Sequence, residues 1–222
     1  MTPPVDKGCA EQTLSETTIL SFAADPPNIC SLIGLFCAVL TIYFAAVGMF
    51  YAAMIGLVWA VCFDWTDGII ARKMKNRRKE QGLVGAQLDS LIDIISFGIC
   101  PAIVLLSWGN FSPWFLPGAF IVVATAALRL SYFNVFGLVD KSTYMGLALD
   151  NNGLILVFVF LFSEVFSHST FSIILYVLFL SLAVLNVAPI RTPKLAGRWY
   201  YVLLAYAVLM TAILGYLWSV VS

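Results

Sequence analysis

The sequence predicts an all-α integral membrane protein, a bundle of about six to seven transmembrane helices with a short N-terminal interfacial segment. Of its 222 residues, 61% are hydrophobic and only 11% are charged, and the mean hydropathy is +0.95. A water-soluble domain of this size carries far more charged surface. The apolar residues also form runs of about 20, the length at which a helix crosses a bilayer. Finally, basic residues occur in every second connection between these runs.

Seven apolar runs are candidate spans, and the fifth and sixth are short, which leaves the count between six and seven. The runs are Asn28–Met49, Phe50–Arg72, Val84–Trp108, Trp114–Phe136, Asn152–Phe166, Phe171–Val187 and Trp199–Val220. We therefore expect one transmembrane domain over residues 28–222, preceded by an N-terminal cytoplasmic or interfacial tail, residues 1–27. Within that tail, Thr13–Ala24 is either a short helix on the membrane surface or a loosely ordered segment.

The distribution of basic residues predicts the orientation. Lys and Arg occur in the tail and in the connections after the second, fourth and sixth runs, but not in the other connections. The positive-inside rule then places the N-terminus and the basic connections in the cytoplasm; in a bacterium the membrane would be the cell membrane. The 12 basic residues balance 12 acidic ones, which argues against a nucleic-acid partner because such proteins carry a basic excess.

Four aspartates lie in two of the apolar runs. Asp64 and Asp67 are three residues apart near the end of the second run, and Asp89 and Asp93 are four apart in the third. Each pair shares one helix face. A carboxylate in mid-membrane costs roughly 2.5–3.5 kcal/mol on the insertion scale, so a bound cation or a polar cavity must offset this cost. A short connection joins the two runs, and the four carboxylates are therefore expected to converge on one site that faces the cytoplasm.

Oxygen ligands of this number suit Mg²⁺ or Mn²⁺, and two such ions can clamp a diphosphate. Small residues accompany the aspartates: Gly68, Ala71 and Gly85 leave room for a base or a pyrophosphate against the helix backbone, or serve as packing residues. The sequence therefore indicates a metal-assisted site for a phosphate-containing substrate.

The pattern Asp64-x2-Asp67-Gly68-x2-Ala71-Arg72, followed by Gly85-x3-Asp89-x3-Asp93, resembles the signature of the CDP-alcohol phosphotransferase (CDP-alcohol phosphatidyltransferase) family. One departure is the spacing. Residues 73–84 separate the two halves, where the family pattern has about eight residues, and we expect a longer basic connection and an intact site.

The resemblance implies roles for these residues. Asp64, Asp67 and Asp89 would hold two divalent ions, and Asp93 would assist them. Asp89 and Asp93 would be catalytic, with Asp93 taking the proton from the acceptor hydroxyl. Its oxygen would attack the β-phosphorus of the CDP-linked donor, and CMP would leave. Asp64 and Asp67, with Gly68, Ala71 and Gly85, would bind the cytidine nucleotide. The resemblance also implies a homodimer.

Two segments are similar to the membrane-type phosphatidylserine synthases within this family, residues 88–102 and residues 128–135. That similarity implies CDP-diacylglycerol as donor and serine as acceptor. Arg129 lies in the second segment, where it would meet the serine carboxylate or a lipid phosphate, or else reach the interface by snorkelling. The candidates for contact with the acceptor or a lipid phosphate are Arg72, Ser96, Arg129, Tyr132, Asn134 and Asp150.

Two departures keep a second acceptor open. Tyr132 stands where that branch has an Arg, and Asp150 follows a segment in which two prolines are missing. An aromatic side chain and an acid would suit the cation of choline, as in bacterial phosphatidylcholine synthases. Inositol and glycerol phosphate are further alternatives. Serine remains the first prediction.

A cation-coupled transporter is the alternative from another class, because intramembrane carboxylates also mark ion pathways. The acids here gather at one end of their helices, while the outer halves are almost wholly apolar, and no internal repeat is visible. The distribution therefore favours the transferase.

Overall fold

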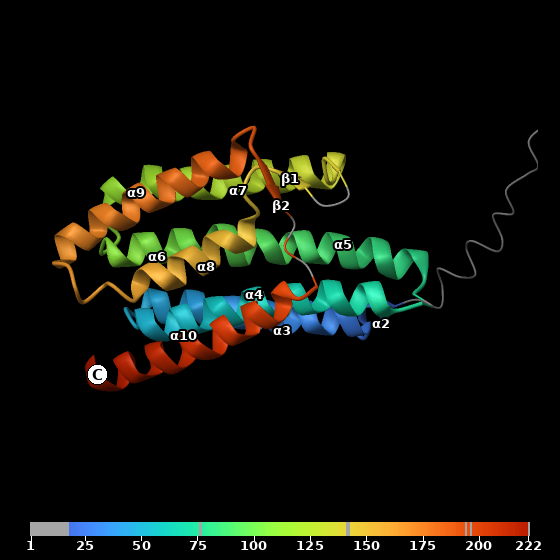
Figure 1. Ribbon diagram of the computed structural model, residues 1–222, viewed down its shortest axis with the longest axis horizontal. Coiled ribbons are helices and arrows are strands. Elements are labelled where there is room, and N and C mark those ends of the chain that lie inside the picture. Colours follow the sequence, from blue (N-terminus) through green and yellow to red (C-terminus); the bar gives the residue numbers. More distant parts are fainter. Residues whose placement is uncertain (1–17, 76, 141–142, 194, 196, 222) are drawn as a thin grey trace, which may run out of the picture.

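The computed structural model of this protein describes residues 18–75, 77–140, 143–193, 195 and 197–221. It consists mainly of helices that run back and forth along one axis (Figure 1). The elements are α2 (Ile19–Ala23), α3 (Pro26–Ala46), α4 (Phe50–Lys73), α5 (Lys79–Asp93), η1 (Ile94–Ile99), α6 (Cys100–Trp108), η2 (Pro113–Phe115), α7 (Leu116–Phe136), β1 (Thr143–Met145), α8 (Leu149–Phe160), α9 (His168–Val187), β2 (Arg191–Pro193) and α10 (Trp199–Val221).

Six helices in the described part of the chain are long and apolar enough to cross a bilayer. α5, η1 and α6 together form the longest of them, a continuous helix of 30 residues. Hydrophobic side chains cover their outward faces, and several of the largest are more than half exposed, among them Phe36, Phe120 and Ile173. Such side chains are stable against lipid, and the predicted all-α membrane bundle is confirmed.

The fifth predicted span is the one that the structure shortens. α8 covers 12 residues, about 18 Å at the rise of an α-helix, and residues 161–166 form turns instead of helix. In Figure 1, α8 nevertheless runs from the middle of the bundle to the end at which α9 begins. The chain between α7 and α8 covers the remaining depth, so the alternation of directions is kept.

Two other helices are longer than predicted. α5 begins at Lys79 instead of Val84, and the Arg78 backbone N–H donates to Gln81 Oε1 at 3.0 Å, which caps this charged first turn. α9 begins at His168 instead of Phe171, because Ser167 caps it by accepting a hydrogen bond from the Thr170 backbone N–H. In both cases polar residues form the first turn of the helix, which hydropathy alone does not detect.

The ends of the bundle differ in charge. One end of the bundle contains the start of α3, the α4–α5 connection, the end of α7 and the start of α10 (Figure 1). The opposite end contains the α3–α4, α6–α7 and α8–α9 connections and the C-terminal end of α10. All described Lys and Arg residues except Arg129 therefore belong to the first end, as the sequence predicted. We call it the basic end; its described Lys and Arg residues are Arg72, Lys73, Lys75, Arg77, Arg78, Lys79, Arg191 and Arg198.

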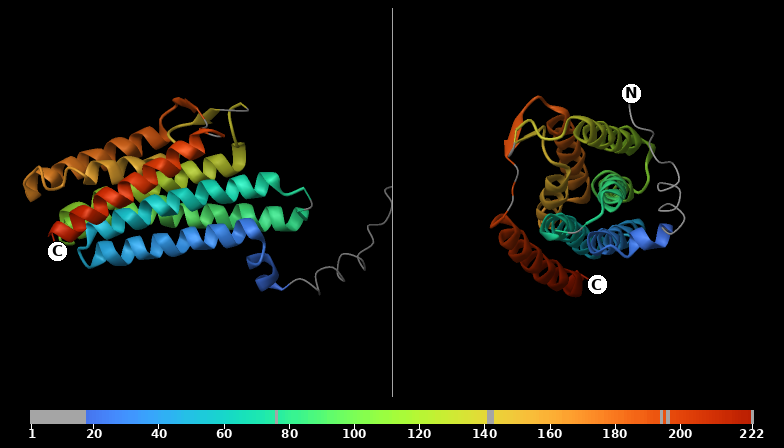
Figure 2. Two further views of the ribbon diagram at one scale, coloured as in Figure 1. Left: turned by 60° about the horizontal axis from the view of Figure 1, so that its bottom comes forward. Right: turned by 90° about the vertical axis from the view of Figure 1, so that its right-hand side faces the viewer.

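α4 lies in the core of the bundle, where Met54, Leu57, Val58 and Val61 are fully buried. It packs against α3, α8 and α10, and α10 lies at the edge of the bundle (Figure 2). This burial stabilises the helix that carries the first two motif aspartates.

Two short strands close the basic end. β1 pairs with β2 in antiparallel fashion, with Tyr144 opposite Thr192. The neighbouring Gly146 has a φ of +75°, and a Cβ atom there would lie 2.2 Å from the carbonyl oxygen of Asn186. Only glycine permits this close approach, which docks the segment before α8 onto the end of α9.

The first predicted span begins at Pro26 in the structure, two residues ahead of the predicted Asn28. α2 falls within the segment for which a surface helix was considered, and its Ile19 and Leu20 are exposed. The rest of the predicted tail, residues 1–17, lies outside the described residues.

Candidate active site

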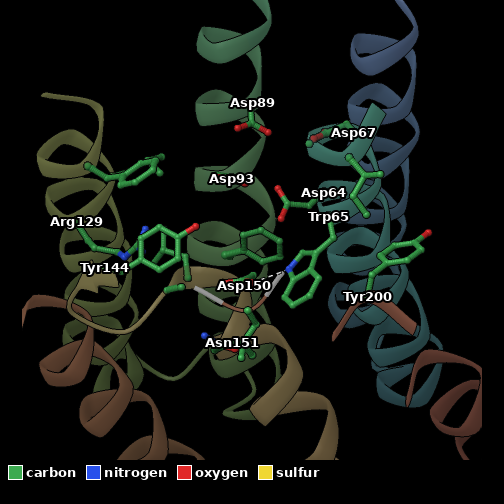
Figure 3. A pocket seen from close by; sticks show the side chains of 18 of the residues that line it. Asp64, Trp65, Asp67, Asp89, Asp93, Arg129, Tyr144, Asp150, Asn151 and Tyr200 are labelled. Atoms are coloured by element: carbon green, nitrogen blue, oxygen red, sulfur yellow. Dashed lines mark hydrogen bonds between the residues drawn. The ribbon is translucent and has the colours of Figure 1, made fainter. Parts of the chain in front are cut away.

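A cavity of about 240 Å³ lies between α4, α5, η1, α7 and α8, below the β1–β2 pair. Figure 3 shows side chains from α4, α5, α7, α8 and α10 and from the β1 segment around it. Its lining residues are Asp64, Trp65, Asp67, Gly68, Ile69, Arg72, Asp89, Asp93, Phe97, Arg129, Leu130, Phe133, Tyr144, Ala148, Leu149, Asp150, Asn151, Pro193, Leu195, Gly197 and Tyr200. The cavity thus contains both motif halves.

Three of the four motif aspartates form a tight group. One carboxylate oxygen from each of Asp64, Asp89 and Asp93 lies within 4.8 Å of the others. Asp93 Oδ1 is buried and has no hydrogen-bond partner among the described residues, an arrangement that costs free energy unless a ligand satisfies it. Three converging carboxylates and an unsatisfied oxygen fit a hard divalent cation such as Mg²⁺ or Mn²⁺.

Asp67 lines the same cavity but lies outside this group of three. Its side chain is buried, and Ser31 Oγ donates a hydrogen bond of 2.5 Å to Asp67 Oδ2. Ser31 comes from α3 and is itself buried. The first spanning helix therefore orients the second motif aspartate, a contact that the motif spacing did not indicate.

A buried ion pair ties the α4–α5 connection to the start of α3. Arg77 Nη2 lies 2.6 Å from Asp25 Oδ2, and Arg77 also donates a hydrogen bond to Asn28 Oδ1. A Cβ atom on Gly85 would lie 2.4 Å from Arg77 Nη2. Gly85, predicted to line the cytidine pocket, does not line the cavity, and its missing side chain makes room for Arg77.

The helix that carries Asp89 and Asp93 changes its winding directly after Asp93. Residues Ile94–Ile99 form a π-helix, and the Cys100 backbone N–H bonds to Ile95 O, five residues back. Pro101 has no N–H to donate to the preceding turn, which accounts for the interruption at this point. The wider turn follows the last motif aspartate, a position at which π-helical turns often accompany functional sites.

Of the other predicted nucleotide-binding residues, Gly68 lines the cavity and Ala71 does not. Arg72 also lines it, and a Cβ atom on Gly68 would lie 3.3 Å from Arg72 Nη1. The absence of a side chain at Gly68 therefore keeps space beside this guanidinium group, a suitable place for a phosphate.

The predicted acceptor contacts divide into two sets. Arg72, Arg129 and Asp150 line the cavity, whereas Ser96, Tyr132 and Asn134 do not. Ser96 Oγ is buried without a hydrogen-bond partner. Tyr132 is 44% exposed, and Asn134 exchanges hydrogen bonds with Ser90 Oγ on α5.

Aromatic residues that the sequence did not single out complete the wall. Trp65 Nε1 donates a hydrogen bond of 2.7 Å to Asp150 Oδ2, and Tyr144 lies beside Arg129 (Figure 3). Tyr200 reaches the cavity from α10 and hydrogen-bonds with Thr66. Burial, followed by the nearby Asp150 carboxylate, raises the pKa of the Tyr144 phenol, so it remains a neutral hydroxyl at physiological pH.

Replacing Ser31 by Ala tests the orientation of Asp67. The change removes one hydrogen bond to a carboxylate that lines the cavity, and outer contacts of this kind typically contribute 10- to 100-fold in metal affinity or activity. We expect the apparent Mn²⁺ affinity in a titration of activity to fall by about 10-fold. Ser31→Thr, which keeps the hydroxyl, is the matched control, and equal affinity in wild type and Ser31→Ala would contradict the assignment.

Comparison with known proteins agrees with this geometry. Residues 25–220 match the family model described as CDP-alcohol phosphatidyltransferase. An archaetidylserine synthase of Methanothermobacter thermautotrophicus is 37% identical over 123 residues, 55% of this chain and 52% of that protein. A CDP-diacylglycerol–serine O-phosphatidyltransferase of Methanocaldococcus jannaschii is 32% identical over 160 residues, 70% of each chain.

A more distant similarity concerns the second acceptor. A phosphatidylcholine synthase of Brucella melitensis is 36% identical over 97 residues, 42% of this chain and 34% of that protein. The family match spans nearly all of the chain and includes both halves of the aspartate motif. Six helices in the described part of the chain are long and apolar enough to span a membrane, and the motif aspartates lie around one cavity. This integral membrane protein belongs to the CDP-alcohol phosphatidyltransferase family.

Proposed function

We propose that the protein transfers the phosphatidyl group of CDP-diacylglycerol to the hydroxyl of serine, giving phosphatidylserine and CMP. The convergence of Asp64, Asp89 and Asp93 in a cavity that also contains Arg129 carries this proposal. The family supports a CDP-linked donor, and the printed names of the two archaeal relatives both specify serine.

The residues of the cavity suggest how the reaction proceeds. Asp93, with its unsatisfied Oδ1, takes the proton of the serine hydroxyl as general base. The hydroxyl oxygen then forms a bond to the β-phosphorus, and the bond from that phosphorus to the oxygen bridging it to CMP breaks. Arg72, beside the space at Gly68, is placed to hold a phosphate oxygen of the donor.

Asp64, Asp67, Asp89 and Asp93 are the residues that would hold divalent ions, Mg²⁺ or Mn²⁺. When bound, such ions neutralise charge on the diphosphate as CMP leaves. The protein's own contribution is to keep these carboxylates in place before the substrate arrives, through Ser31 and the packing of α4 and α5 against α3.

We infer that the cavity opens to the cytoplasm. The basic end, which the positive-inside rule assigns to the cytoplasmic side, carries the α4–α5 connection and the β1–β2 pair next to the cavity. Serine and CMP are water-soluble and would exchange there, while the acyl chains of the donor would remain in the bilayer. The homodimer implied by the family resemblance stays a prediction.

Choline is the second candidate acceptor, because Asp150 lines the cavity and a phosphatidylcholine synthase is among the similar proteins. The position of Arg129 favours serine. Its guanidinium group would face the serine carboxylate, whereas choline offers it no anion and would leave two cations in one buried space. The transporter alternative has no comparable support, since the family consists of transferases.

The acceptor is tested by measuring CMP release from CDP-diacylglycerol by the purified protein in mixed micelles with Mn²⁺ or Mg²⁺. Serine, choline, inositol and glycerol 3-phosphate are supplied one at a time. We expect turnover with serine to exceed that with each other acceptor by at least about 100-fold, because the buried charged groups of such a site would be left unpaired by the wrong acceptor. Turnover with choline and not with serine would replace the proposal by the second candidate.

A further inference from the structure

Two opposite charges lie on different walls of the cavity, beyond the group of three aspartates. Arg129 comes from α7, and Asp150 comes from the first turn of α8. Both line the cavity with Tyr144 between them in the view of Figure 3. The proposed reaction uses the motif aspartates for chemistry and Arg129 for the serine carboxylate, and it leaves Asp150 without a role.

The positive charge is held firmly by neutral groups and makes no direct ion pair with a described residue. Arg129 is 8% exposed, its Nε donates a hydrogen bond of 2.8 Å to Leu147 O, and its guanidinium carbon lies 5.8 Å from the Phe133 ring centre and 5.5 Å from that of Tyr144. Among the described residues, no carboxylate lies within 4.0 Å of it. A buried guanidinium group that has no directly paired carboxylate can still bind the carboxylate or phosphate of a ligand.

The negative charge is likewise fixed by a neutral partner. Trp65 Nε1 donates to Asp150 Oδ2, and the N-terminus of α8 favours a carboxylate in this position. In the part of the chain that the structure describes, no Lys or Arg nitrogen lies within 4.0 Å of Asp150. Asp150 is also outside the group of three aspartates that fits a metal ion, so an organic cation is the ligand that it suits.

We propose that Arg129 and Asp150 together recognise a zwitterionic acceptor, with Arg129 binding the carboxylate and Asp150 the ammonium group of a hydroxy-amino acid. This inference rests on the proposed function and deepens it, since it names the charges by which the cavity selects its acceptor. An acceptor with only one of the two charges leaves a buried group unpaired, and the site rejects it for that reason. The acid at position 150 then completes an amino-acid site and does not signal choline.

Three acceptors separate the two charges. L-Serine carries both, ethanolamine lacks the carboxylate, and 3-hydroxypropionate lacks the ammonium group. The variants Asp150→Asn and Arg129→Gln each remove one protein charge while keeping a polar side chain, and Asp140→Asn is the matched control, because Asp140 does not line the cavity. Initial rates of CMP release give kcat and KM for each combination, and the unfolding midpoint in detergent monitors the fold.

In Asp150→Asn we expect the serine KM to rise by about 10- to 100-fold, because one hydrogen bond to a charged group is lost. The kcat should stay within about 3-fold of wild type. The kcat/KM for 3-hydroxypropionate stays within about 3-fold, because this acceptor never used Asp150. In Arg129→Gln the preference for serine over ethanolamine falls by a similar factor, and Asp140→Asn behaves as wild type.

The outcomes are distinguishable. If wild type uses serine but Asp150→Asn leaves its KM unchanged, or lowers the rates with all acceptors equally, the charge-pair inference is overturned and the proposed function stands. If wild type uses choline, inositol or glycerol 3-phosphate and no hydroxy-amino acid, the proposed function and the inference both fall. If wild type uses another hydroxy-amino acid in place of serine and shows the KM effect, the inference stands and the assignment of serine falls.

Discussion

Asp93→Asn abolishes CMP release, with an expected fall in kcat of at least about 10³-fold, because the change removes the proposed general base and weakens the carboxylate group that fits a cation. Asn has nearly the shape of Asp, and the half-buried position of Asp93 at the junction of α5 and η1 is filled in both proteins. The loss would therefore be chemical and not a consequence of misfolding. The measurement is single-turnover CMP release from CDP-diacylglycerol with saturating serine.

Glu80→Gln is the matched control for this variant. Glu80 lies in the first turn of the same helix, is exposed and does not line the cavity. It is expected to keep wild-type turnover. A kcat for Asp93→Asn within about 10-fold of wild type, less than the usual contribution of a general base, would exclude Asp93 from proton transfer.

Removal of divalent ions is the second change with a large expected effect. Treatment with EDTA should reduce turnover to background, and addition of Mg²⁺ or Mn²⁺ should restore it. The reason is that the carboxylates of Asp64, Asp89 and Asp93 repel one another unless a cation lies between them. The same ions should also raise the thermal unfolding midpoint of the protein, since a ligand that binds only the folded state stabilises it. This second readout does not depend on catalysis.

The rise in the unfolding midpoint should be lost in Asp64→Asn and kept in Glu80→Gln. Asp64 contributes one of the three oxygens within 4.8 Å, whereas Glu80 is remote from the cavity. The aspartates would act without a cation if EDTA left turnover unchanged and the ions did not shift the unfolding midpoint.

The helices of this protein could be predicted well because hydropathy and charge act locally. A run of apolar residues crosses a bilayer whatever its neighbours are, and the alternation of basic connections with connections that lack Lys and Arg follows from the order of residues alone. Predictions were less accurate at helix ends. The hydropathy of Lys79–Leu83 and His168–Thr170 is low, yet hydrogen bonds within the chain make these residues the first turns of α5 and α9.

The aspartate group was accessible from sequence for a similar reason. Spacings of three and four residues place the carboxylates on one face of each helix, and a short connection brings the two helices together. The same reasoning predicted a role in the nucleotide pocket for Gly85, which the structure places against Arg77. Contact between the α4–α5 connection and α3 decides that position, and no spacing within the motif contains this information.

The sequence by itself therefore determined the membrane bundle, the family and the aspartates that lie together, and the direction of the helices through the bilayer stays a prediction from its charges. Only the tertiary structure decided what surrounds them. Ser31, which is 36 residues before Asp67 in the sequence, hydrogen-bonds to it from α3. The β1 segment brings Tyr144 beside Arg129 because Gly146 packs against the end of α9. Helical periodicity relates residues within one segment, whereas these contacts depend on how separate segments pack, and packing is a property of the folded chain as a whole.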